Sequence, residues 1–190
     1  MTHIQGQLGQ RIMIIGCGGA GKSTLARLLG EALGLPVIHL DAEYWQPGWV
    51  ETPRDEWQRT VETLAQGDRW IIDGNYNGTL QTRLQQADTV LFLDYPWWLC
   101  LCRVLKRWLM YQGRTRPDMN PGCHERIDGA FIKWVCVDFP RRSRARILQL
   151  LNEHGAHAQV ISHRSPHATG RWLRSVSAAQ EKEDASENQA

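Results

Sequence analysis

The chain has 190 residues, of which 42% are hydrophobic and 22% are charged. These proportions exclude wholesale disorder and fit one domain with a substantial core. The formal net charge of +2 by itself argues against a protein that coats nucleic acid. Arginine supplies 18 of the 22 basic residues, and its guanidinium group suits bidentate recognition of phosphate.

The N-terminal end and the cysteines narrow the cellular setting. Residues 1–10 are polar and carry no Lys or Arg, unlike a secretory signal peptide. No stretch reaches the roughly 18 apolar residues that span a bilayer. The five cysteines include no C-x-x-C pair, so neither a disulfide framework nor a zinc site is indicated. We therefore expect a cytoplasmic protein with reduced thiols and no membrane partner.

Short apolar runs alternate with amphipathic stretches along the chain. The first strand, expected over 11–15, leads into a glycine-rich turn, after which apolar residues recur at helical spacing up to Leu33. Thr52 is a good N-cap for a later helix, with Pro53 at its first position. The remaining elements are predicted as strands over 36–40, 69–72, 89–93 and 157–161 and as helices over 53–66, 96–112, 125–138 and 141–154.

This alternation predicts an α/β fold with a central five-stranded parallel sheet that helices cover on both faces. Residues 11–174 would form that domain, after the polar extension over 1–10. A polar segment over 113–124 contains Pro and Gly and separates two predicted helices. The last residues, 175–190, are polar and acidic, so we expect them to be disordered.

The segment 16–23 matches the phosphate-loop pattern G-x-x-x-x-G-K-[ST] and lies between a predicted strand and helix, the context that supports this motif. The glycines let backbone N–H groups curl around phosphate oxygens at a helix N-terminus. Lys22 would reach the β and γ phosphates of ATP, and Ser23 would ligate Mg²⁺. The residues expected to bind the nucleotide are Gly16, Gly18, Gly19, Ala20, Gly21, Lys22, Ser23 and Thr24. The sequence thus predicts a three-layer P-loop NTPase fold.

Other features narrow the kind of P-loop protein. A switch GTPase would carry a guanine-reading N-K-x-D motif, which is missing, and large motor ATPases need a longer chain. A single small domain fits a kinase of small molecules. At this point the chain resembles the nucleoside/nucleotide kinase group, which includes adenylate, shikimate and gluconate kinases. W-I-I-D-G-N-Y at 70–76 is similar to the strand and Asp-Gly element of adenylate kinases, and V-L-F-L-D at 90–94 to the strand after it.

The chain resembles more closely the bacterial family of DNA topology modulation proteins, which are adenylate-kinase-like. The matching stretches span about residues 11–162 and include H-L-D at 39–41, W-Q-P-G-W at 45–49, D-G-N-Y at 73–76, W-L-C at 98–100 with Arg103, R-T-R-P-D-M at 114–119 and F-P-R-R-S at 139–143. The family name describes a cellular effect rather than a reaction, so it says little about mechanism.

Two carboxylates follow predicted strands. Asp41 falls in the crevice at the carboxyl ends of the strands, where open α/β sheets bind ligands. In hydroxyl-phosphorylating relatives an acid here contacts the acceptor, which implies a catalytic base at Asp41; a helix cap is the alternative. The resemblance also implies that Asp73 holds Mg²⁺ together with Ser23. A turn residue before Gly74 is the alternative for Asp73.

Aromatic residues gather after Asp41, where an acceptor would enter. Tyr44, Trp45 and Trp49 have two open interpretations, stacking on a base or sugar and covering the sheet as core. Three further tryptophans lie at helical spacing and are expected in the core: Trp97, Trp98 and Trp108.

Between residues 103 and 146 there are 11 basic and four acidic residues. Arg114 and Arg116 fall in 113–124, where related kinases carry a lid, so the resemblance implies that both act catalytically by closing over the triphosphate. A second set could begin the next helix: Arg141, Arg142, Arg144 and Arg146. A solvated basic face is the alternative.

The first hypothesis is an ATP- and Mg²⁺-dependent kinase whose acceptor is a nucleoside, a nucleotide or a hydroxylated metabolite. The accepting group stays open, because a phosphate acceptor needs no general base and a hydroxyl acceptor needs Asp41. The second hypothesis is a nucleotide-dependent regulator that acts on DNA, with ATP as a switch. The basic segment 103–146 is its only support, and no DNA-reading motif is visible.

Overall fold

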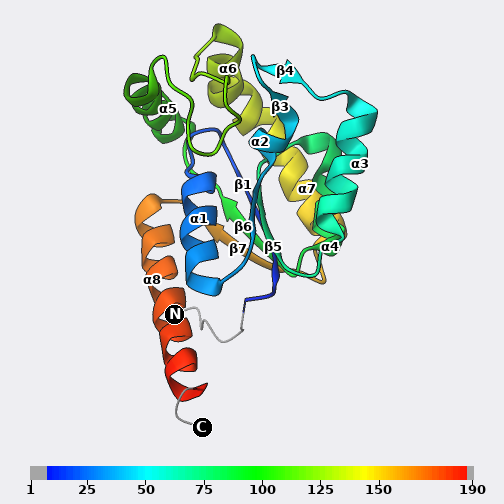
Figure 1. The fold of residues 1–190 in the computed structure, drawn as a ribbon, viewed down its shortest axis with the longest axis vertical. Coiled ribbons are helices and arrows are strands. Elements are labelled where there is room, and N and C mark those ends of the chain that lie inside the picture. The colour runs from blue at the N-terminus through cyan, green and yellow to red at the C-terminus, as the bar shows by residue number, and fades with distance from the viewer. Residues whose placement is uncertain (1–7, 188–190) are drawn as a thin grey trace.

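The computed structural model describes residues 8–187 and is built around a five-stranded sheet of order β2-β5-β1-β6-β7, in which every neighbouring pair is parallel. This sheet confirms the predicted fold class (Figure 1). Its strands are β1 (Arg11–Gly16), β2 (Val37–His39), β5 (Trp70–Asp73), β6 (Thr89–Leu93) and β7 (Gln159–His163).

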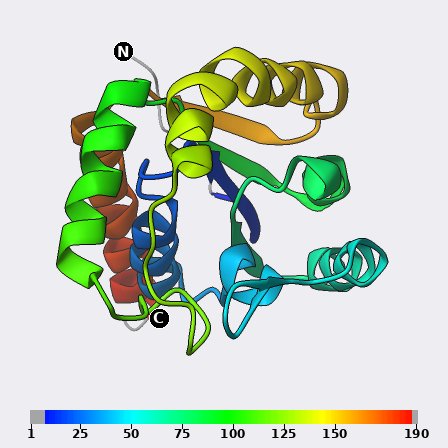
Figure 2. The same ribbon diagram turned by 90° about the horizontal axis from the view of Figure 1, so that it is seen from above.

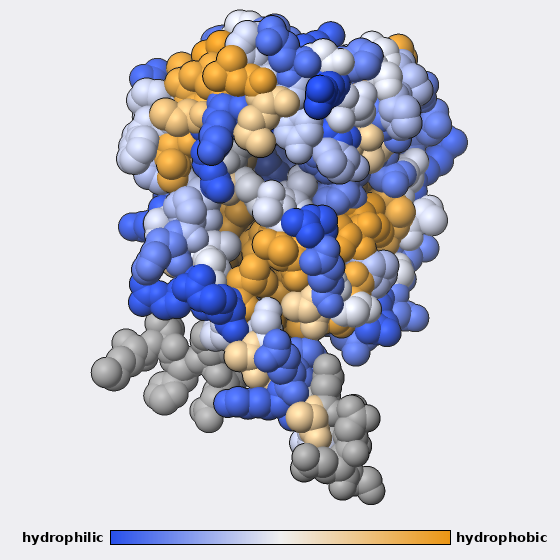
Figure 3. Space-filling view, turned by 60° about the vertical axis from the view of Figure 1, so that its left-hand side comes forward, coloured by the Kyte–Doolittle hydropathy of each residue, from blue (hydrophilic) through white to orange (hydrophobic). Residues whose placement is uncertain are grey.

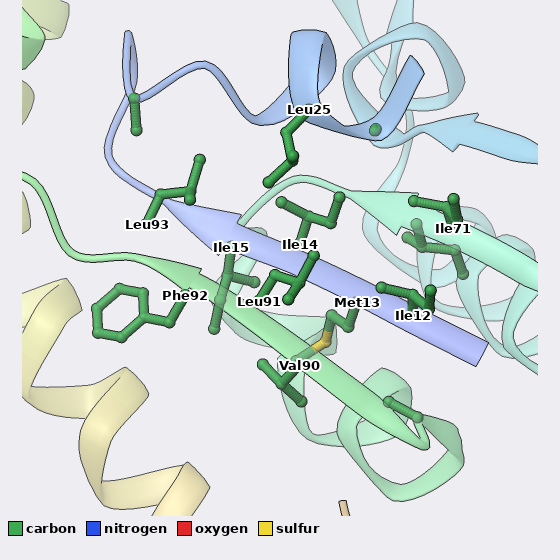
Figure 4. Close-up of a cluster of buried hydrophobic side chains, with 14 of the residues drawn as sticks. Ile12, Met13, Ile14, Ile15, Leu25, Ile71, Val90, Leu91, Phe92 and Leu93 are labelled. Carbon is green, nitrogen blue, oxygen red and sulfur yellow. The ribbon is translucent and has the colours of Figure 1, made fainter. Parts of the chain in front are cut away.

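The central strand β1 forms the middle of the core. Its apolar run from Ile12 to Ile15 has no exposed area, as expected for a strand with both faces covered (Figure 4). The register pairs Ile14 with Asp73 on β5 and with Leu91 on β6. The carboxyl ends of three strands therefore meet at one edge of the sheet, and the loops after them face the same space.

Helices cover both faces of the sheet (Figures 1 and 2). Helices α1 and α8 lie on one side, and α3, α4 and α7 lie on the other, while α5 runs near the carboxyl edge on the α1 side. The helices are α1 (Lys22–Leu33), α2 (Leu40–Tyr44), α3 (Arg54–Ala65), α4 (Leu80–Gln86), α5 (Trp97–Tyr111), α6 (Gly129–Lys133), α7 (Arg144–His154) and α8 (Pro166–Glu187), with a 3₁₀ turn η1 (Asn77–Thr79) and a π-helical stretch η2 (Trp134–Ser143).

The chain from α6 to α7 is one continuous helical run, whereas the sequence predicted a break between 125–138 and 141–154. The run includes Pro140, which lies inside η2. A proline in an α-helix lacks its N–H and clashes with the carbonyl four residues back. The wider π turn changes that spacing, so the helix passes through the proline without ending.

Helix α8 continues to Glu187, although the sequence predicted disorder from residue 175. Trp172 and Val176 anchor the helix, since both are buried in the core cluster. The Ala, Glu, Lys and Gln residues after them are good helix formers, so the acidic stretch extends the anchored helix. Residues 188–190 of the predicted tail, and 1–7 of the predicted N-terminal extension, lie outside the described residues. Within the extension, the Gly9 N–H bonds the Thr89 hydroxyl of β6.

The outer face of α5 is apolar and exposed, which corrects the expectation of core tryptophans. Trp97 and Trp98 are 45% and 56% exposed, and Leu109 is 67% exposed; Trp108 is half-buried. Helical spacing identifies a face but not the side of the helix that packs. Figure 3 shows hydrophobic side chains at the surface on the side of the molecule where α1, α5 and α8 lie. Within residues 8–187, no helix is long and apolar enough to cross a membrane.

Candidate phosphate-transfer site

The predicted phosphate loop joins β1 to α1 and has a backbone that only glycine fits at two positions. Gly19 has φ +81°, and a Cβ there would lie 2.4 Å from the Cys100 carbonyl oxygen of α5. Gly21, at the N-cap of α1, has φ +94°. Both values fall in the left-handed region, which side chains disfavour. The loop therefore packs tightly against α5 while its N–H groups stay near the helix N-terminus.

One side chain within the loop and one from outside it fix its shape. The Lys22 ammonium donates to the carbonyls of Gly16 and Cys17 at 3.1 and 3.2 Å. The Asn75 side chain clamps Gly16, accepting its N–H at 3.0 Å and donating to its carbonyl at 2.7 Å. In the sequence, Asn75 is part of the D-G-N-Y stretch at 73–76, and no role was predicted for it. Its position just after β5, which neighbours β1, is the signal that indicates it.

The two residues predicted to hold Mg²⁺ lie side by side. The Ser23 hydroxyl donates to Asp73 Oδ2 at 2.8 Å, and the Asp73 side chain is only 4% exposed. Its other oxygen lies 2.5 Å from His39 Nδ1. This bond to Asp73 raises the pKa of His39 above its usual range, although burial opposes the shift. One hydroxyl and one carboxylate oxygen, next to a loop that suits phosphates, fit the few protein ligands that Mg²⁺ takes.

A buried arginine supports the chain after β5. Arg83 on α4 is fully buried and donates to the carbonyls of Gly74, Asn75 and Tyr76, the first at 2.9 Å. Burial lowers the pKa of this guanidinium. The sequence predicted no helix over 80–86, so this support was missed. Arg83 fixes the turn that carries Asn75 to the phosphate loop.

Asp41 lies in the first turn of α2, just beyond β2. Its Oδ1 accepts a hydrogen bond from the Tyr76 hydroxyl at 2.8 Å. Burial, and then the charge of Asp41, raise the pKa of Tyr76 above its usual range, so Tyr76 stays a donor. Asp41, Lys22 and Ser23 line one cavity of about 1230 Å³, while Asp73 lies behind Ser23 and His39. The structure thus brings Asp41, Lys22 and Ser23 to one cavity, and Asp73 adjoins it through its bonds to Ser23 and His39.

The two predicted lid arginines have different environments. Arg116 is buried and lines the cavity, where it pairs with Asp118 at 2.9 Å and with Glu125 at 2.6 Å. Glu125 is also buried and pairs with Arg107 of α5 at 2.8 Å. Arg114 is exposed and does not line the cavity. The second predicted set also lies outside it, and Arg144 pairs instead with Asp94.

The 112–126 segment, which contains the predicted lid, contacts a short antiparallel hairpin. The sequence predicted no strands at this hairpin. The hairpin consists of β3 (Trp45–Gln46) and β4 (Val50–Glu51). The Gly48 N–H donates to the Gly122 carbonyl at 3.3 Å, and the Trp49 indole N–H donates to the His124 carbonyl at 2.9 Å. The Asn120 amide donates to the carbonyls of Ala42 and Trp45. The Arg126 guanidinium lies over the Trp49 ring, 4.8 Å from its centroid. The segment therefore forms a wall of the cavity together with the hairpin.

Helix α5 turns a basic face toward the phosphate loop. Arg103 donates to the Ala20 carbonyl at 3.1 Å, and Lys106 lines the cavity one turn further along. The sequence indicated that both residues belong to the basic segment 103–146 and did not link them to the loop. Trp45 and Trp49 line the cavity on its other side, with ring centroids 5.3 Å apart, and Tyr44 packs on Tyr76 behind them.

The fold and the loop together define a P-loop α/β domain. Among solved structures, a gluconokinase from Sinorhizobium meliloti 1021 is 15% identical with a TM-score of 0.51, covering 93% of this chain and 94% of that one. A shikimate kinase from Acinetobacter baumannii, in complex with shikimate, is 18% identical with a TM-score of 0.50, covering 90% of this chain and 91% of that one. No protein-family model matches the chain, and no curated protein sequence does. At these identities the similarity establishes the fold: the chain shares the α/β fold of these two structures.

Proposed function

We propose that the protein transfers the γ-phosphate of ATP to a hydroxyl group of a small molecule, with Mg²⁺. One observation carries this proposal. The Asp41 carboxylate, whose one hydrogen-bond donor among the described residues is the Tyr76 hydroxyl, lines the same cavity as Lys22 and Ser23. A carboxylate opposite a phosphate loop suits the proton transfer that a hydroxyl acceptor requires.

On the donor side, which we define as the 16–24 loop with Arg103 and Lys106, the chain supplies positive charge. Lys22 would leave its loop carbonyls to contact the β and γ phosphates, and the loop N–H groups would hold their oxygens. Ser23 and Asp73 would orient Mg²⁺, which when bound neutralises charge on the phosphates. Arg103 reaches the loop from α5 and is a stronger candidate for a second cation than Arg114.

On the acceptor side, which we define as Asp41, Tyr76, the 45–51 hairpin and the 112–126 segment, the chain supplies the base. Asp41 accepts the proton of the acceptor hydroxyl while that oxygen bonds to the γ-phosphorus. The bond from this phosphorus to the β–γ bridging oxygen breaks, and ADP leaves. The hydrogen bond from Tyr76 holds Asp41 in place for this step.

A closing role for Arg114 and Arg116 stays a prediction. The charge of Arg116 is already balanced by Asp118 and Glu125, so its release toward a triphosphate would leave Asp118 without an ion-pair partner and Glu125 with Arg107 alone. The pairing favours Arg116 as part of the acceptor wall. The switch that acts on DNA gains no support from the fold comparison, and Arg107, Arg116 and Arg144 of its basic segment are paired internally.

The variant Asp41→Asn removes the charge of the proposed base and tests the proposal. A second variant, Glu43→Gln, removes one negative charge from an exposed position of the same helix α2 and controls for a general effect of charge. Acceptor-dependent ADP release should fall by about 10²–10⁴-fold in Asp41→Asn, the range for loss of a general base. Glu43→Gln should leave it unchanged, and both should bind ATP normally.

The assay would cover hydroxyl compounds and nucleoside monophosphates. Phosphorylation of a nucleotide at a rate that Asp41→Asn leaves unchanged would contradict a hydroxyl acceptor. Release of ADP at one rate with every compound would reduce the protein to an ATPase.

A further inference from the structure

We infer that the acceptor is an uncharged or cationic hydroxyl compound, and that the site discriminates against acceptors that carry a carboxylate or phosphate. This inference rests on the proposed function and adds the charge class of the substrate. It follows from how the charged side chains around the cavity are paired, which differs between its two sides.

Two carboxylates on the acceptor side, Asp41 and Glu51, have no cation partner among the described residues. Asp41 accepts from the Tyr76 hydroxyl. Glu51 lies on β4 and lines the cavity, exposed to solvent, and burial together with the proximity of Glu51 raises the pKa of the Tyr44 hydroxyl. Among the described residues, neither carboxylate forms an ion pair. No cation of the described residues therefore neutralises either carboxylate, and both face an incoming acceptor.

The buried cations of the acceptor side are already neutralised. Arg116 lies between two carboxylates, Glu125 and Asp118, and its side chain is 9% exposed. Arg107 shares Glu125. An anionic acceptor could gain Arg116 only by displacing Asp118, which has no other ion pair among the described residues, or Glu125, which would keep only Arg107. Arg126 is the exception, since it stacks over Trp49, but it is exposed to solvent, where its attraction for an anion is weakened.

Aromatic rings form the rest of this surface. Trp45 and Trp49 line the cavity beside Glu51, and Trp45 pairs directly with Glu51 across the hairpin. Tyr76 adds a third ring near Asp41. The face of an aromatic ring carries partial negative charge and attracts cations or the apolar faces of neutral rings. Rings and carboxylates together repel anions.

The donor side has the opposite character, because Lys22 and Arg103 bond only to backbone carbonyls and Lys106 has no ion pair among the described residues. Their positive charges stay available for a triphosphate. An anionic molecule in the cavity is therefore drawn to the loop, and the space around Asp41 is left to a molecule without negative charge.

The experiment uses two sets of acceptors that differ in charge. Glucosamine, glucose and glucuronate share one ring and are cationic, neutral and anionic; uridine and uridine monophosphate form a second pair. Phosphate transfer from ATP gives kcat/KM, and quenching of tryptophan fluorescence gives binding without turnover. We expect the cationic or neutral member of a set to exceed the anionic member by at least about 10-fold in both readouts.

The variant Glu51→Lys reverses the charge, and Glu51→Gln removes it with less change of shape. Both should reduce the preference against anions, Glu51→Lys more strongly. The control Glu62→Lys makes the same change on an exposed position of α3 outside the cavity and should alter nothing.

A wild-type preference for the anionic member, or an equal effect of Glu51→Lys on every charge class, would overturn the inference and leave the kinase proposal intact. If no compound accepts phosphate, the proposed function fails instead. The binding order measured by fluorescence still decides the charge preference in that case.

Discussion

The donor and acceptor sides face each other across one cavity and are held by different kinds of contact. The donor side is mostly backbone: Gly19 packs on the Cys100 carbonyl, and Asn75 clamps both polar groups of Gly16. The acceptor side is mostly side chains, joined through the buried Glu125 and through Asn120. A backbone site can bind any triphosphate, whereas a side-chain site can be changed residue by residue. It follows that the acceptor side can change by substitution while the site for the triphosphate stays the same.

Apart from loss of the proposed base, the largest effect is expected from a change that breaks the donor side alone. Lys22→Met should lower kcat for phosphate transfer by about 10²–10³-fold, as for other losses of a charge that stabilises a transition state. The stability of the protein should hardly change, because Lys22 bonds only carbonyls of its own loop. Steady-state kinetics with thermal unfolding as a parallel check would measure both. Unaltered turnover would show that the loop does not contact the transferred phosphate.

A change at Glu125, which joins helix α5 to the 112–126 segment, should lower the stability of the protein. Glu125→Gln removes the negative charge between Arg107 and Arg116, and the Glu125 side chain is only 1% exposed. Arg107 would lose its carboxylate partner and Arg116 would keep only Asp118, at a cost of about 3 kcal/mol in the free energy of unfolding. Urea unfolding measures this loss. Glu31→Gln, which breaks an exposed pair with Arg27, is the matched control and should have no measurable effect. Equal effects of the two variants would contradict a stabilising role for the buried ion pairs of Glu125.

Of these three changes, the one confined to contacts of the acceptor side should have the smallest effect. The Asn120 amide donates to the carbonyls of Ala42 and Trp45, on either side of the end of α2. Asn120→Ala should cost about 1 kcal/mol per lost hydrogen bond. It should also raise KM for the acceptor while KM for ATP stays constant, because α2 carries Asp41. Asn152→Ala, on an exposed position of α7, serves as the control. A parallel rise in both KM values would show that the two sides are not separable.

The sequence predicted the donor side better than the acceptor side, for physical reasons. The phosphate loop is a local motif whose spacing follows from its backbone shape, so residues 16–23 identify it without tertiary information. The buried strands are equally local, because continuous apolar runs mark them. Contacts between distant segments leave no such pattern. Arg116 and Glu125 look like ordinary charges until the chain reversal between Gln112 and Glu125 brings them together.

The missed residues share this origin. Asn75 and Arg83 bond backbone atoms of other segments, and identifying those partners requires knowing which strands and helices are neighbours in the fold. The tryptophans of α5 show a related limit, because both faces of that helix carry apolar residues. Cys100 and Val104 are buried, and the expectation of a buried Trp98 was wrong. A period of 3.6 residues fixes which side chains share a face, but the packing partner decides which face is covered.

The rate at which the Cys17 thiol is alkylated can measure how often the phosphate loop opens. Cys17 has no exposed area, whereas Cys102, two residues after its neighbour Cys100, is exposed. A hydrogen bond with Cys100, and burial, raise the pKa of the Cys17 thiol, so little of the reactive thiolate is present. An alkylating reagent should modify Cys102 at once and Cys17 only when the loop leaves its place against α5. The labelling rate of Cys17 therefore measures how often the loop opens, and a triphosphate that occupies the loop should slow it.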